Sequence, residues 1–112
     1  MKFRKYEFNS QNEWNTLKPS IQTIYEHNNA SVFTDCNVAE LGYLIKTPAV
    51  IDSNNKIITP AILSTKFAVD ILWHNDIIPA SFKQYEVWPK DIGSHTFWGA
   101  EDLYKQDYDK RK

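Results

Sequence analysis

The chain has 112 residues, of which 42% are hydrophobic and 24% charged, and its 13 basic and 14 acidic side chains give a net charge of −1. This length suits one domain, so we expect residues 1–112 to form a single domain, and the hydrophobic content excludes wholesale disorder. The three glycines are too dispersed for a phosphate-binding loop, and a chain without a dense basic stripe is not expected to bind nucleic acid.

No charge-free run approaches the roughly 20 apolar residues of a membrane helix, and the N-terminal sequence lacks the apolar core of a secretory signal. Cys36 is the single cysteine, which excludes an intramolecular disulfide and a cysteine-rich zinc site. We therefore expect a cytoplasmic protein with no membrane contact and no cofactor.

Residues 2–8 have a mixed period-two pattern that ends at Asn9-Ser10, which predicts a first strand. Ser10 and Glu13 then fit a capping box, which predicts the start of an amphipathic helix. Because Pro19 cannot continue a regular helix, we expect either a kinked helix over 11–27 or two short helices over 11–17 and 19–27. The apolar face of this segment, which we expect to pack on the sheet, consists of Trp14, Leu17, Ile21 and Ile24.

Branched and aromatic residues over 31–36 and 38–46 predict two strands or one broken strand. Residues 49–59 have the clearest local pattern, a hairpin whose turn uses the tolerance of asparagine for positive φ. Residues 66–74 predict a largely buried strand in the same sheet as the hairpin. One face of that strand would carry Phe67, Val69, Ile71 and Trp73.

The rest of the chain is less regular. Residues 79–84 predict one helical turn, residues 85–88 a short strand ended by Pro89, and residues 96–98 a last short strand. Residues 99–112 are a polar tail with the spacing of a weak helix, frayed from about residue 107 to residue 112. This order predicts an α+β fold, an antiparallel sheet with an N-terminal amphipathic helix packed on one face and a short helical C-terminal tail.

The most suggestive set of metal ligands is His74 with Asp76, to which folding would have to add His95 and Asp70. Their spacing matches no specific metal motif, and Asp76 fits better as a turn residue at the start of a loop. We therefore expect no metal site and no catalytic residue. A metal-dependent hydrolase using His74, Asp76 and His95 remains the alternative function.

A nucleophile paired with a base would need Cys36 beside a histidine, or Ser64 or Ser94 beside His95. No flanking motif supports either pairing, and Cys36 fits a small buried hydrophobe. Asp70 is the oddest residue, because a carboxylate in an apolar strand is costly to bury unless it is paired. It is either a general base with a raised pKa or a residue on a solvent-open face.

Sixteen residues are aromatic, and six of them fall between Trp73 and Trp98, where Pro79, Pro89 and Gly93 interrupt regular structure. A small domain needs about half of these rings for its core, so several should lie on loops as anchors of a protein interface, unless all of them are core. The expected binding residues are Tyr85, Trp88 and Trp98.

These observations predict a small non-enzymatic interaction or assembly protein that binds itself or a protein partner through this aromatic-rich segment. The near-zero net charge permits self-association. Residue usage, with eleven Lys and eleven Ile but two Arg and three Gly, is common in AT-rich bacterial or phage genomes. We therefore expect a phage or another mobile element as the source.

Overall fold

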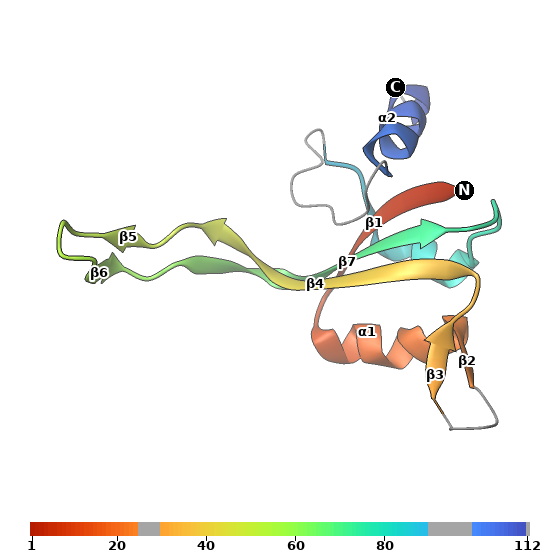
Figure 1. Ribbon diagram of the computed structural model, residues 1–112, viewed down its shortest axis with the longest axis horizontal. Helices are drawn as coiled ribbons and strands as arrows, with labels where there is room; N and C mark the ends of the chain where they lie inside the picture. The colour runs from red at the N-terminus through yellow and green to blue at the C-terminus, as the bar shows by residue number, and fades with distance from the viewer. Residues whose placement is uncertain (25–29, 90–99, 112) are drawn as a thin grey trace.

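The computed structural model describes residues 1–24, 30–89 and 100–111, which form a body and a projecting two-stranded arm (Figure 1). We call residues 43–65, the part of one long hairpin that leaves the body, the arm. The Cα radius of gyration is 16.7 Å, against about 13 Å for a compact chain of this length. The arm lies along the longest dimension of the molecule, which measures 53 Å.

The body is built on a four-stranded antiparallel sheet with the order β4-β7-β1-β8. Its strands are β1 (Lys2–Phe8), β4 (Cys36–Thr47), β7 (Ile62–Trp73) and β8 (Glu86–Val87). The first strand lies inside the sheet and pairs with β7 along its whole length, from Lys2 opposite Trp73 to Phe8 opposite Phe67. The predicted α+β class with an antiparallel sheet is therefore confirmed.

The smaller elements complete the body and the arm. Strands β2 (Gln22–Ile24) and β3 (Ser31–Phe33) form one separate ribbon, and β5 (Val50–Ile51) and β6 (Ile57–Thr59) form another at the tip of the arm. The helical elements are α1 (Gln11–Leu17), the 3₁₀ helices η1 (Lys18–Ile21) and η2 (Ala80–Tyr85), and α2 (Ala100–Arg111). None of the helices within the described ranges has the length and apolar character needed to cross a membrane.

The predicted hairpin over 49–59 is present, but its placement was wrong. We expected it in the same sheet as residues 66–74, and it forms the two-stranded tip of the arm instead. The turn itself follows the predicted chemistry. Asn55 has a φ of 62°, and the Asp52 carboxylate accepts hydrogen bonds from the backbone N–H groups of Asn54 at 2.8 Å and Lys56 at 2.9 Å.

Helix α1 begins as predicted, with the Ser10 hydroxyl accepting from the Glu13 N–H at 3.2 Å. It is not packed as predicted, because it ends at Leu17 and the chain turns through η1 into strand β2. Of the expected apolar face, Trp14 is fully buried while Ile24 is 65% exposed. Pro19 provides no N–H for a continuing α-helix, and the β-branched Thr23 and Ile24 then favour an extended ribbon.

Both faces of the sheet are covered, and a separate hydrophobic core lies on each face. One core contains the predicted face of β7, and it is closed by α1 and η2 through Trp14 and Phe82. The other core is smaller and holds Phe3 against Tyr104 of α2, with ring centroids 6.2 Å apart. The first core consists of Tyr6, Phe8, Trp14, Cys36, Phe67, Val69, Ile71, Trp73 and Phe82.

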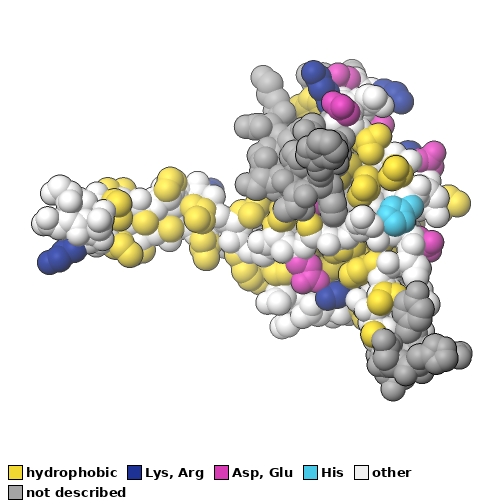
Figure 2. Space-filling model, viewed as in Figure 1, with side chains coloured by type: hydrophobic (Ala, Val, Ile, Leu, Met, Phe, Trp, Pro, Cys, Tyr) yellow, Lys and Arg dark blue, Asp and Glu magenta, His cyan; other side chains and the backbone are white. Residues whose placement is uncertain are grey.

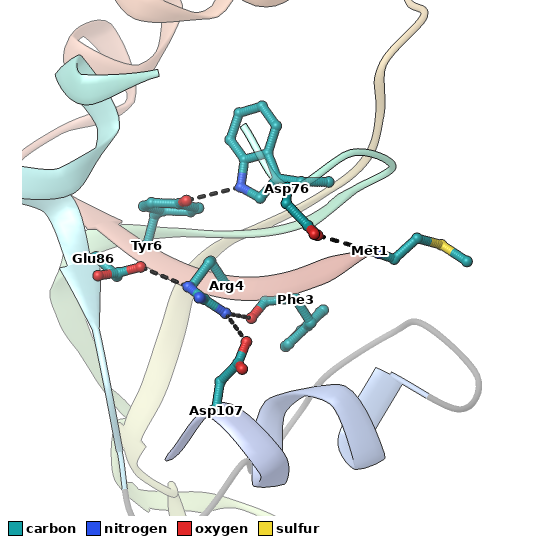
Figure 3. A network of polar contacts seen from close by, with 8 residues as sticks. Met1, Phe3, Arg4, Tyr6, Asp76, Glu86 and Asp107 are labelled. Atoms are coloured by element: carbon teal, nitrogen blue, oxygen red, sulfur yellow. Dashed lines mark hydrogen bonds and ion pairs between the residues drawn. The ribbon is translucent and has the colours of Figure 1, made fainter. Parts of the chain in front are cut away.

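Helix α2 runs further than the frayed tail we expected. It continues to Arg111, and Arg4 holds it against the sheet (Figure 3). The Arg4 guanidinium donates to the Phe3 carbonyl at 2.9 Å and forms ion pairs with Glu86 at 2.9 Å and Asp107 at 2.6 Å. One side chain of β1 therefore joins β8 and the last helix.

Candidate interaction surface

The arm is a two-stranded ribbon, and no other described element of the chain covers it. Strands β4 and β7 run on past the body, and their ends pair only with each other among the described residues. In the body, residues 67–71 of β7 are all buried, whereas residues 62, 63, 65 and 66 of the same strand are exposed. A two-stranded ribbon of this kind is at best marginally stable in water by itself.

Both faces of the arm are apolar. Val50 and Ile51 are consecutive residues of β5, and the bulge in this pairing, at Ile58, lies on the partner strand β6. The side chains of Val50 and Ile51 therefore point to opposite faces of the ribbon. They are 50% and 54% exposed. Ile62 and Leu63, consecutive on β7 nearer the body, also point to opposite faces, and they are 54% and 52% exposed. Similar exposures on the two faces mean that neither face is covered.

Most of the exposed large hydrophobic residues in the described part of the chain lie on the arm, along which Figure 2 shows hydrophobic side chains in yellow. Twelve large hydrophobic residues are exposed there and in the body together, and nine of them lie between positions 43 and 63. Their exposed area is on the order of 900 Å² over the two faces of the arm, against roughly 300–600 Å² for the largest contiguous apolar patch of a typical monomer. These nine are Tyr43, Leu44, Ile45, Val50, Ile51, Ile57, Ile58, Ile62 and Leu63.

The root of the arm is attached firmly to the body. β4 carries an extra residue between Glu40 and Gly42, and Gly42 adopts a φ of 79° that side-chain-bearing residues rarely take. The Tyr43 hydroxyl accepts from the Gln11 N–H at 3.0 Å, and its ring lies edge-on to Phe67 at 5.5 Å. The direction in which the arm leaves the body is therefore set by α1 and the sheet.

Glu40 ties α1 to the same part of β4. Its Oε1 accepts hydrogen bonds from Lys18 Nζ at 2.7 Å and Trp14 Nε1 at 2.9 Å. These two bonds, the one from Lys18 foremost, hold the pKa of the Glu40 carboxyl below its usual value.

A shallow groove of about 470 Å³ runs along the foot of the arm. Apolar side chains of both arm strands line it together with polar residues, among them Glu7, Lys46 and Lys66. Protein contact surfaces commonly combine apolar and polar side chains in this way.

The predicted aromatic anchors occupy different places. Tyr85 is half-buried with its ring 4.5 Å from that of Phe8. Trp88 is also half-buried, stacked on Tyr104 at 5.6 Å with the Arg4 guanidinium 4.8 Å from its ring. Trp98 lies outside the described residues, as does the strand predicted over 96–98. Both described rings therefore pack within the body and expose only part of their surface.

The residues of the alternative metal site do not form a cluster in the described part of the chain. His74 Nε2 lies 2.6 Å from Asn37 Oδ1, and Asp76 forms an ion pair with the Met1 amino group at 3.5 Å (Figure 3). His95 lies outside the described residues. Over residues 1–24, 30–89 and 100–111, no three His, Cys, Asp or Glu side chains are placed to hold a metal ion.

Asp70 is buried, so the predicted alternative of a solvent-open face was wrong. Both of its carboxylate oxygens accept from Lys5 Nζ at 3.1 Å, across the β1–β7 pairing. A salt bridge of this kind accounts for a carboxylate inside a sheet without a catalytic role.

The two other candidate nucleophiles that the structure describes, Cys36 and Ser64, lie in different regions of the molecule. Cys36 is buried in the first core, and burial together with the nearby Asp35 raises its pKa to about 11, which disfavours the thiolate. Ser64 lies on the arm, where its hydroxyl accepts from the Lys66 N–H at 3.1 Å. Ser94 lies outside the described residues.

Our sequence prediction missed the arm as a surface, although the sequence holds a signal for it. Adjacent apolar pairs such as Val50-Ile51, Ile57-Ile58 and Ile62-Leu63 do not alternate with polar residues. Such pairs are typical of strands buried on both faces.

Comparison with protein-family models, with curated proteins and with solved structures finds no match to this chain.

Proposed function

We propose that this protein is a non-enzymatic assembly protein of the cytoplasm that binds itself or another protein through its arm. The observation that carries the proposal is the exposure of apolar side chains on both faces of a ribbon with no third strand in the described residues. Such a ribbon gains most of its stability by being covered.

The division of the molecule supports this role. The body has cores on both faces of its sheet, an ion-paired last helix and hydrogen bonds that fix the root of the arm. A rigid body that presents an apolar projection is suited to joining subunits, because little chain entropy is lost when the projection is covered. A small assembly protein of a phage or another mobile element fits this description.

Site-specific photo-crosslinking in the cells that produce the protein tests the proposal. A photoreactive amino acid replaces Ile58 at the tip or Ile62 nearer the root, and exposed Gln106 on α2 is the matched control position. We expect a covalent protein adduct of discrete mass from both arm positions and none from position 106. If irradiation yields no protein adduct from either arm position, the arm is not an interface and the proposal is wrong.

A further inference from the structure

We propose that the partner of the arm is further copies of this chain, and that each arm lies between two neighbouring copies in a head-to-tail assembly of more than two chains. This inference rests on the proposed function, since it names the partner of the same surface. It follows from three properties of the arm, namely where the apolar surface lies, how many faces carry it, and how large each face is.

The location of the apolar surface points to self-association through arms. Outside the arm, the exposed large hydrophobic residues of the described chain are Met1, Ile24 and Ile77, which belong to three different elements or loops. The body therefore offers no second surface of matching area among those residues. When copies of this chain meet, the surface that complements one arm is another arm.

The charge of the arm agrees with this packing. Only three charged residues, Lys46, Asp52 and Lys56, occur between positions 43 and 65. Packing two arms against each other therefore removes few charges from water, which keeps the desolvation cost low. The net charge of −1 adds little repulsion between whole chains.

The two faces decide the geometry. We call the face that carries Val50 the first face and the face that carries Ile51 the second. A two-fold contact between identical first faces would leave both second faces in water. A contact between the first face of one copy and the second face of the next covers both, and it repeats into a closed ring or an open filament.

The area of each face leads to the same result. The exposed apolar area of the arm, on the order of 900 Å² in total, is shared between its two faces, so each face by itself offers less than the roughly 800 Å² that each partner contributes to a standard interface. One such contact is therefore weak. Two contacts on each chain together reach the standard area, so an assembly in which every arm has two neighbours is more stable per chain than a dimer.

Two variants that each block one face test this geometry. Val50→Lys places a charge on the first face and Ile51→Lys places one on the second, while Ile77→Lys, at an exposed position of the body, is the matched control. Purified full-length chains are compared by native mass spectrometry and light scattering between about 1 and 100 µM, concentrations at which weak interfaces such as this one become occupied.

We expect the unmodified chain and Ile77→Lys to form species of more than two chains, and each arm variant alone to be monomeric. An equimolar mixture of the two arm variants should form a 1:1 dimer and nothing larger, because one variant retains the second face and the other retains the first. Circular dichroism spectra that match the unmodified chain show that each variant is folded.

Several results would overturn the inference. An unmodified chain that stays monomeric excludes self-association, and an arm variant that dimerises by itself indicates a two-fold contact. A mixture that remains monomeric excludes the head-to-tail contact. If the unmodified chain is monomeric while the photo-crosslinked arm forms adducts with a different protein, the proposed function stands and the self-association inference fails.

Discussion

Strands β4 and β7 run through both the body and the arm, and the two regions differ in how many layers cover these strands. In the body, Phe67 packs toward α1 while Ala68 points to the opposite face, and both are buried. A few residues earlier on the same strand, Ile62 and Leu63 point to opposite faces and both remain half exposed. The hydrophobic pattern of a strand therefore predicts that both of its faces are buried. It does not predict whether the covering residues come from the same chain or from another one.

The largest expected difference between the two regions is the effect of truncating an apolar side chain. Trp14→Ala empties a fully buried site in the body and should lower the free energy of unfolding by about 3–5 kcal/mol. Ile58→Ala on the arm, the matched control, should change it by no more than about 0.5 kcal/mol at concentrations where the chain is monomeric. Urea unfolding followed by circular dichroism measures both, and equal losses would contradict the division into body and arm.

The buried salt bridge should produce the next largest effect. Asp70→Ala leaves the Lys5 ammonium without its carboxylate in a buried site, which should cost about 3 kcal/mol. The double variant Lys5→Met/Asp70→Leu replaces the pair with apolar groups and should recover at least half of that loss. The same urea titration tests this, and a double variant less stable than Asp70→Ala would show that the pair does more than satisfy its own charges.

Gly42 tests the junction between the two regions. An added Cβ would lie 3.9 Å from Phe67 Cε2, an ordinary contact, so the cost of Gly42→Ala comes from the backbone. At a φ of 79° this cost is about 1 kcal/mol, and Gly42→Asn should cost less because asparagine tolerates that conformation. Thermal unfolding of the two variants measures the difference, and equal stability of Gly42→Ala and the unmodified chain would contradict it.

The smallest expected effect is a change in pH dependence at the root of the arm. The pKa of Glu40 is lower in the folded protein than its usual 4.5, so its bonds to Lys18 and Trp14 stabilise the fold above pH 4.5 and lose their contribution as the pH falls further. Because Glu40 is partly exposed, the contribution is no more than about 0.5 kcal/mol. Glu40→Gln should flatten the fall in stability below pH 4.5, and an unchanged slope would contradict this assignment.

Local sequence patterns predicted the elements that depend on neighbouring residues. The strand over 2–8, the first short helix over 11–17 and the hairpin turn near Asn55 all follow from alternation, capping and turn preference. The pairing of Lys5 with Asp70 was not predictable in this way, because it depends on the register between strands 65 residues apart. The arm was missed for a related reason: its pattern matches that of a core strand, and only the tertiary structure shows that no layer formed by residues 1–24, 30–89 or 100–111 covers it.

The position of β1 inside the sheet has a consequence for synthesis. During synthesis β1 cannot pair until its neighbours in the sheet have been made. Strand β7 begins more than 50 residues after β1, and β8 follows later still. At about 5–20 residues per second this wait lasts seconds, whereas a hairpin closes in microseconds. All residues of the arm are therefore synthesised before β8 and α2, so its apolar segment leaves the ribosome before the body that holds its root can be completed.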